Sequence, residues 1–186
     1  MKKEIFKAIR DRIKEAFPHV WVDKNMGQIT SIDRFDSFPL PAVLIEFARS
    51  EYRTLSKGVQ EVNTVLRFHL LFENWAASHA ESEDSELALR YFDFTEAVHE
   101  ALEGFGGENF ASLTRVADEE DNNHESVVIT VMEYATTYID TSAEKPRNKV
   151  EVEPDLKVEY KNPLSRPNSN FTSLFVVPPD PSTGSG

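Results

Sequence analysis

The sequence predicts an α+β fold, with a mainly antiparallel sheet, two amphipathic helices packed on one of its faces and an extended proline-rich C-terminal arm. Three observations support this. Two segments carry apolar residues at helical spacing, several others alternate as strands do, and most of the ten prolines follow residue 140. We therefore expect a domain over residues 1–140 and an arm, with a mobile end, over residues 141–186.

The clearest helix is expected over residues 87–105, where apolar side chains recur at steps of three and four. The residues on this face are Leu87, Tyr91, Phe94, Val98, Leu102 and Phe105. Asp84 and its serine neighbours are candidate caps at its start, and Gly104 is expected to end it in the left-handed conformation. A second helix is expected over residues 2–17, ended by Pro18.

Alternating segments predict the strands of the sheet. Residues 20–22 form a short candidate, and residues 42–47 are apolar on nearly both faces, as in a strand at the centre of a sheet. Residues 59–75 give the longest strand signal. Residues 110–117 and 126–140 are expected to pair as a hairpin, with the acidic residues between them forming its turn.

Two regions are candidates for contacts between subunits. On the more polar face of the strand at 59–75, Val65 and Leu71 interrupt the polar residues and indicate a contact outside the monomer. The arm contains alternating apolar residues that could add as edge strands to a neighbouring sheet, although a disordered tail fits its composition equally well. The subunit-interface candidates are Val65, Leu71, Leu156, Val158, Tyr160, Phe171, Leu174 and Phe175.

Composition limits the classes of function. The formal charge is −12, from 32 acidic and 20 basic residues, so the protein repels phosphate backbones and sequence-specific DNA binding is disfavoured. The absence of cysteine excludes disulfides, thiol nucleophiles and cysteine-ligated metals. Charged residues interrupt every long apolar run, so we expect a soluble protein made in the cytoplasm, with no membrane partner.

Motifs for catalysis or metal binding are weak. The five histidines form no metal-binding pair, and the acidic segment at 118–124 is a poor calcium loop because Asn123 stands where glycine is needed. The glycines after residue 103 follow a helix instead of opening one, so they predict no phosphate site. We expect no metal and no cofactor. An enzyme is the less favoured class, and would need a pocket that gathers perturbed acids or histidines.

The order of the predicted elements resembles the tail terminator proteins of tailed phages and related contractile injection particles. The resemblance covers roughly residues 1–140. It is carried by the leading helix, the strands at 41–46 and 59–75, the helix at 87–105, the strand containing Phe110 and Leu113, and the strand at 127–140. It implies a hexameric ring that caps the tail tube, stops further tube subunits from adding and offers a surface to the head or neck.

The resemblance also implies partners and a place in the virion. The ring would form in the host cytoplasm and occupy the head-proximal end of the tail, in contact with tail tube protein, with head–tail connector or neck proteins and, where a sheath exists, with sheath protein. DNA would pass through without specific binding, which an acidic lumen permits. The lumen candidates are Glu81, Glu83, Asp84, Glu119, Glu120 and Asp121, and a hydrated surface is the simpler interpretation of each.

Two alternatives remain open. A head–tail joining or neck subunit would share the ring architecture but occupy a layer nearer the head. A small acidic adaptor or inhibitor that binds a basic partner would show the same charge. Size in solution separates a ring from an adaptor, because an adaptor should stay monomeric or dimeric.

Overall fold

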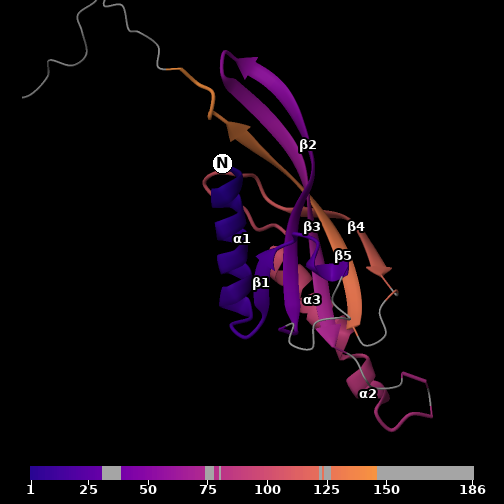
Figure 1. The fold of residues 1–186 in the computed structure, drawn as a ribbon. Coiled ribbons are helices and arrows are strands. Elements are labelled where there is room, and N and C mark those ends of the chain that lie inside the picture. Colours follow the sequence, from indigo (N-terminus) through magenta and orange to yellow (C-terminus); the bar gives the residue numbers. More distant parts are fainter. Residues whose placement is uncertain (31–38, 74–77, 80, 122, 124–126, 146–186) are drawn as a thin grey trace, which may run out of the picture. The chain divides into compact units, whose positions relative to one another are not determined.

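Five strands form one mixed sheet in the computed structural model (Figure 1). In spatial order they are β1 (Trp21–Lys24), β2 (Ala42–Ser56), β3 (Val59–Glu73), β5 (Val127–Asp140) and β4 (Thr114–Asp121). β1 runs parallel to β2, and every other neighbouring pair is antiparallel. With two helices longer than ten residues, the fold is α+β. β3 lies at the centre, so the expectation that residues 42–47 form the central strand is wrong, although β2 has a neighbour on each side there.

The structure describes residues 1–30, 39–73, 78–79, 81–121, 123 and 127–145. The chain divides into two units, Met1–Pro146 and Arg147–Gly186, and all described residues belong to the first. The arm's interface candidates therefore lie outside the described residues. They are Leu156, Val158, Tyr160, Phe171, Leu174 and Phe175.

The helices α1 (Lys2–Ala16) and α3 (Arg90–Leu102) pack on the same face of the sheet. The predicted spacing in α1 is confirmed, because Ile5, Ile9 and Ile13 are fully buried. They share one core cluster with residues from α3, β2, β3 and β5, including Val98, Leu102, Val43, Leu66, Phe68 and Tyr134. Neither these helices nor any other described helix is long and apolar enough to cross a membrane.

The predicted helix at 87–105 is broken near its start. A short helix, α2 (Ser85–Ala88), precedes α3, and Leu89 lies between them. Ala88 is buried while Leu87 is 51% exposed, so Leu87 does not belong to the buried face. Asp84 occupies the N-cap position of α2, as expected, but its side chain makes no capping hydrogen bond. The end of the helix agrees better with the prediction, because α3 stops at Leu102 and Gly104 takes a φ of +73°.

A second, smaller core lies on the sheet face that the helices leave uncovered. Its buried residues are Ala42, Leu44, Leu71, Val127, Ile129 and Val131, and Ile29 and Leu40 pack against them. Leu71 is fully buried inside this chain, so its assignment as a subunit-interface residue is wrong. Val65, the other candidate on this strand, is half-buried and keeps some exposed surface.

The predicted acidic turn is largely a strand. Asp118 to Asp121 belong to β4 and pair with residues 129–132 of β5, so the predicted strand at 110–117 is displaced toward the C-terminus. Phe110 instead forms an isolated bridge with Gly107. β4 lies at the edge of the sheet, where charged side chains reach solvent and discourage unwanted pairing. This explains how an acidic sequence can form a strand.

The β2–β3 hairpin is longer than the sequence indicates, because residues 48–56 continue β2 in pairing with β3. Its outer end extends past the first turn of α1 (Figure 1). The turn between the strands lies at Lys57 and Gly58, and Gly58 has a φ of +83°. A Cβ atom on Gly58 would come within 2.3 Å of the Ala143 carbonyl oxygen, so the residues after β5 lie against the hairpin turn.

Candidate functional site

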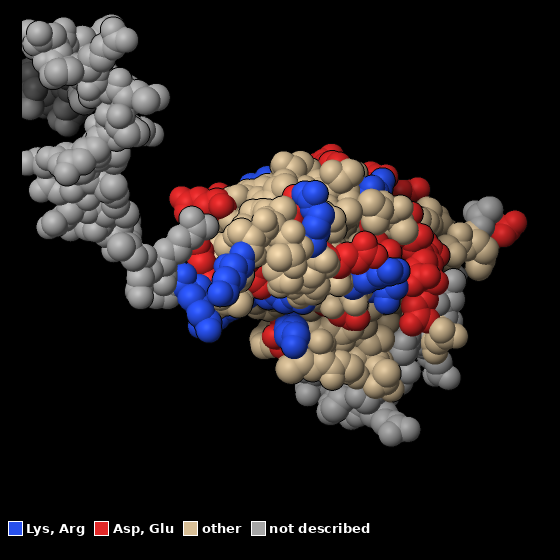
Figure 2. Space-filling view, turned by 90° about the horizontal axis from the view of Figure 1, so that it is seen from above, with Lys and Arg blue, Asp and Glu red and all other residues tan. Residues whose placement is uncertain are grey.

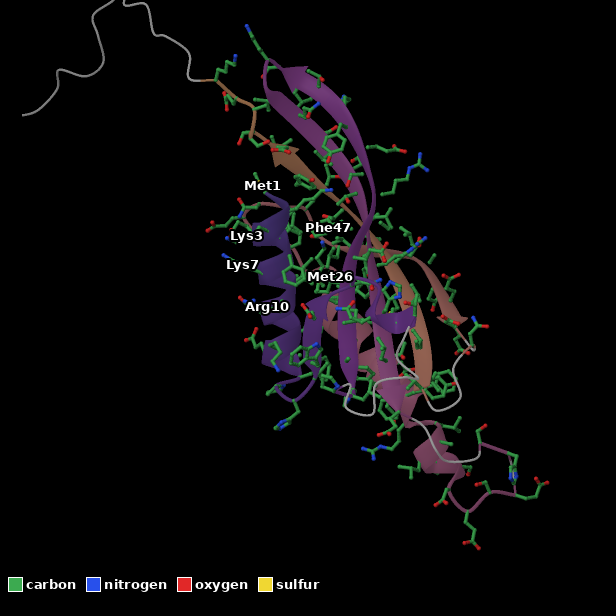
Figure 3. All side chains as sticks on the ribbon, in the orientation of Figure 1. Met1, Lys3, Lys7, Arg10, Met26 and Phe47 are labelled. Atoms are coloured by element: carbon green, nitrogen blue, oxygen red, sulfur yellow. The ribbon has the colours of Figure 1, made fainter. Side chains whose placement is uncertain are left out.

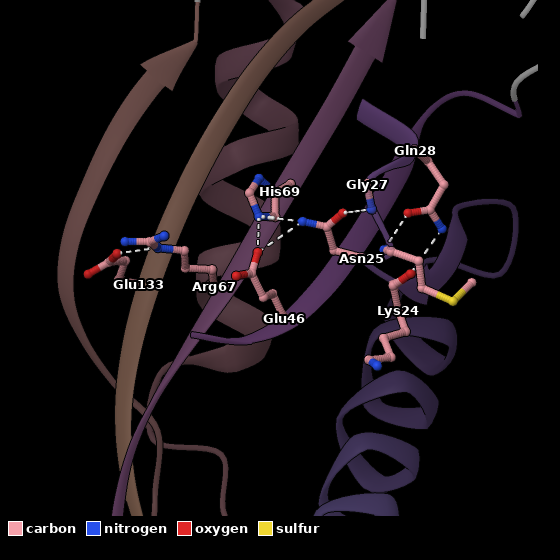
Figure 4. Close-up of polar contacts among 9 residues, drawn as sticks. Lys24, Asn25, Gly27, Gln28, Glu46, Arg67, His69 and Glu133 are labelled. Carbon is pink, nitrogen blue, oxygen red and sulfur yellow. Dashed lines mark hydrogen bonds and ion pairs between the residues drawn. The ribbon is translucent and has the colours of Figure 1, made fainter. Parts of the chain in front are cut away.

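A polar cluster lies where three segments meet on the sheet face opposite the helices (Figure 4). Asn25 follows β1, Glu46 lies in β2 and His69 lies in β3. Nε2 of His69 is 3.1 Å from Oε2 of Glu46, and Nδ2 of Asn25 is 2.9 Å from the same oxygen. Beside them, Nε of Arg67 donates to Oε1 of Glu133 at 2.5 Å. The cluster ties the turn after β1 to β2 and β3.

The hydrogen bonds define which atoms donate. The backbone N–H of Gly27 donates to Oδ1 of Asn25 at 3.0 Å, so the amide group of Asn25 points its donors at Glu46. A carboxylate oxygen only accepts, and every contact to it is favourable when Nε2 of His69 carries a proton. Nδ2 of Asn25 and Nε2 of His69 then both donate to the same oxygen of Glu46. They lie 3.2 Å apart but form no hydrogen bond with each other.

The electrostatics of the cluster favour a charged Glu46. Burial would raise the pKa of Glu46, but hydrogen bonds from His69 and Asn25, with the nearby charges of His69 and Arg67, outweigh it and lower the pKa below the ordinary 4.5. The hydrogen bond to Glu133 raises the pKa of Arg67. A carboxylate with a lowered pKa is a weak base at neutral pH, so the cluster is better suited to holding structure than to proton transfer.

Replacing Glu46 with glutamine should lower stability in a pH-dependent way. The pKa of Glu46 is lower in the folded chain than in the unfolded chain. The stability that this shift provides is therefore fully present above the unfolded pKa, and it is lost as the pH falls through the folded pKa. We expect Glu46→Gln to cost about 1 kcal/mol at pH 7 and less below pH 4.5. Urea unfolding across this pH range measures the difference, with the exposed Glu100→Gln as control. A constant cost at all pH values would contradict the assignment.

Two hollows of opposite charge adjoin the turn at residues 25–30. One has a volume of about 690 Å³, and we call it the basic groove. It is lined by Lys2, Lys3, Phe6, Lys24, Asn25, Gly27, Glu46 and Phe47. Figure 3 labels Lys3 on α1 and Phe47 on β2, which contribute to its lining. The ammonium group of Lys2 lies 5.3 Å from the centre of the Phe47 ring, a cation–π contact that holds this lysine at the groove.

The second hollow, of about 450 Å³, lies beside β4. Glu119, Glu120 and Asp121 line it together with His69 and Asn25. It shares Asn25 and Gly27 with the basic groove, so one turn separates a positive from a negative surface. On the face seen in Figure 2, acidic and basic side chains are interspersed instead of forming one continuous patch of a single sign.

The structure divides the lumen candidates between two places. Glu119, Glu120 and Asp121 come together along β4, with the first two exposed and the third half-buried. Glu81, Glu83 and Asp84 lie on the exposed segment before α2, and Oε2 of Glu81 is 3.4 Å from Nδ1 of His79.

Val65 lines a shallow hollow over β2, β3 and β5, which makes it the one described interface candidate that keeps accessible surface. No local sequence pattern indicates the basic groove, because the lysines that line it come from α1 and β1 and meet only in the folded chain.

Comparison with known proteins gives no match for this chain, either among protein-family models or among curated proteins. Within the part of the chain that the structure describes, no group of three or more histidine, aspartate or glutamate side chains is placed to hold a metal ion. The physical arrangement of strands, edges and charges is therefore the basis for the functional proposal.

Proposed function

We propose that this protein is a structural subunit of a phage tail or related contractile particle, and that it forms a ring, most simply a hexamer, which caps the tail tube. The ring ends polymerisation of the tube and gives the head or neck a surface to attach to. The proposal is supported by the resemblance in element order to tail terminator proteins. The observation that carries it is the β2–β3 hairpin.

The hairpin has the character of a contact surface. Its strands are 15 residues each, yet the fully buried positions of β2 end at Ile45. Beyond that point Tyr52 and Leu55 are 51% and 49% exposed. Exposed aromatic and aliphatic side chains on the outer half of an edge-exposed strand are typical of surfaces that a neighbouring protein covers. A tube subunit or a second copy of the ring protein would satisfy them.

The charge of the chain suits a ring through which DNA passes. A net charge of −12 disfavours adhesion to phosphates. A passage that attracted phosphates would slow the DNA, because each neutralised phosphate adds to affinity. The ring would therefore let DNA pass without binding it.

Size and tube capping test the proposal. Light scattering of the purified protein should give a particle about six times the 21.2 kDa chain mass, and negative-stain images should show rings. Added to growing tail tube protein from the same particle, the chain should limit tube length. A species that stays monomeric at every concentration and leaves tube growth unchanged would exclude this function.

An acidic adaptor is the second candidate, and one observation favours it. Seven of the eight residues of β4 are exposed, which presents carboxylates along an open sheet edge to any basic partner. The size measurement decides between the two, because an adaptor would bind a basic protein as a monomer or dimer. A neck or head–tail joining subunit would also form a ring, but would bind connector protein instead of tube ends.

A further inference from the structure

The two edges of the sheet carry opposite charge. At one edge, β4 has a strand partner only in β5 among the described residues. Its exposed acids are Asp118, Glu119 and Glu120, which we call the acidic edge. Nη1 of Arg115 lies 3.9 Å from Oδ2 of Asp118. Within the described residues, Glu119 and Glu120 have no cationic side chain at such a distance. Exposed Val116, at 55%, adds an apolar contact point.

The opposite edge is short and leaves a neighbour exposed. β1 has only four residues and pairs with β2 from Ala42 to Ile45. From Glu46 onward, β2 has no strand partner on that side within the described ranges. The basic groove opens at this point, with Glu46 and Phe47 in its lining. Three lysines against one glutamate give it a positive charge on a protein that is strongly negative as a whole.

We propose that the acidic edge of one copy docks in the basic groove of the next copy, so that β4 lies alongside the open part of β2. This inference rests on the proposed ring and names the contact that would build it. Lys2, Lys3 and Lys24 would face the carboxylates of Asp118, Glu119 and Glu120. Backbone pairing along the open edge of β2 would supply affinity, and the charges would select the partner.

The geometry of the two edges explains why such a contact would build a closed assembly. The surfaces differ and belong to opposite edges of one sheet, on the two sides of the turn at residues 25–30, so each copy uses its acidic edge on one neighbour and its basic groove on the other. A head-to-tail contact of this kind forms a ring when the rotation between copies closes. Two acidic edges repel each other, so β4 cannot pair with β4 of another copy and the wrong dimer is avoided.

Ionic strength decides whether local attraction overcomes the net repulsion between copies. At physiological salt the Debye length is about 8 Å, so charges in direct contact dominate and the distant charges of a −12 chain are screened. Assembly should therefore be weak in very dilute buffer, where the whole-molecule repulsion acts. It should be strongest at moderate salt and weaken again in concentrated salt.

Charge reversal in the full-length chain tests the contact. We expect a groove-reversed variant, Lys3→Glu with Lys24→Glu, and an edge-reversed variant, Glu119→Lys with Glu120→Lys, each to associate at least about tenfold more weakly than the original chain in sedimentation velocity. Mixing the two variants should restore assembly, because each edge then meets a groove of opposite sign. Lys7→Glu and Glu100→Lys, which reverse charges elsewhere, should assemble normally.

Cross-linking gives a second measurement that does not depend on ring formation. The chain has no cysteine, so Val116→Cys on β4 and Met26→Cys beside the groove can be introduced alone or together. With a flexible bis-maleimide, the double variant should give a ladder of cross-linked copies, and either single variant should stop at dimers. Absence of a ladder, or normal assembly of either charge-reversed variant, would overturn the proposed contact.

The two proposals fail in different ways. Rings that form without the ladder and tolerate charge reversal would keep the proposed function and remove this contact. A ladder from a chain that has no effect on tube growth would keep the contact and remove the proposed function. A monomer that gives no ladder would remove both.

Discussion

Leu102→Ala should lower the free energy of unfolding by about 2–5 kcal/mol. Leu102 is the last residue of α3 and is completely buried in the core between the helices and the sheet. Removing its side chain loses the hydrophobic transfer energy and leaves a cavity, because the central strands β3 and β5 cannot move to fill it without losing their own pairing. Urea unfolding followed by circular dichroism measures the effect.

Leu87→Ala is the matched control, because the same chemical change is made where the side chain is 51% exposed. We expect a cost within about 0.5 kcal/mol there. The sequence places Leu87 and Leu102 on one helical stripe, whereas the structure breaks the stripe at Leu89. Equal costs for the two substitutions would mean that the stripe is continuous. A cost under about 1 kcal/mol for Leu102→Ala would mean that this helix face is not buried.

Gly58→Ala should destabilise the protein by at least about 2 kcal/mol, for two separate reasons. Its φ of +83° is a conformation that residues with a Cβ rarely adopt. The new Cβ would also come within 2.3 Å of the carbonyl oxygen of Ala143, a backbone atom that can move only if its whole segment moves. Thermal unfolding and urea unfolding both report the loss.

Gly27→Ala separates the two reasons. Gly27 has a φ of +92°, but a Cβ there would meet nothing within 4 Å. We expect a cost of about 1–2 kcal/mol from the backbone conformation alone. The difference between the two variants then measures the collision with Ala143. If both variants cost the same, the residues after β5 do not press on the hairpin turn.

Sequence patterns that repeat over a few positions correctly predict α1 and the face of β3 that meets the helices. The spacing of Ile5, Ile9 and Ile13 predicts α1 correctly, because burial of one helical face repeats every three or four residues. The alternation of Val62, Leu66 and Phe68 likewise identifies the face of β3 that meets the helices. Each of these depends on neighbours within a few positions.

Features set by distant residues could not be predicted in this way. Leu71 is an apolar residue on a face with polar residues, and its burial in a cluster with Ala42, Ile129 and residues distant in sequence follows only from the tertiary fold. The acids of β4 favour a turn by composition, but pairing with β5 holds them in a strand. The basic groove requires Lys2 and Lys24 to meet, and no local pattern connects them.

Apolar residues fill both sides of the sheet at only one end. The pairing of Ala42 with Leu71 and of Leu71 with Ile129 lies in the second core, whereas the far half of β2 has solvent on most of its side chains. Breaking the backbone hydrogen bonds of this far half would cost far less free energy than breaking those beside the second core. The amide protons of residues 51–56 would therefore exchange first. The outer part of β2 can thus adapt to a partner, while β3, which pairs with β5 as far as Gln60, keeps its shape.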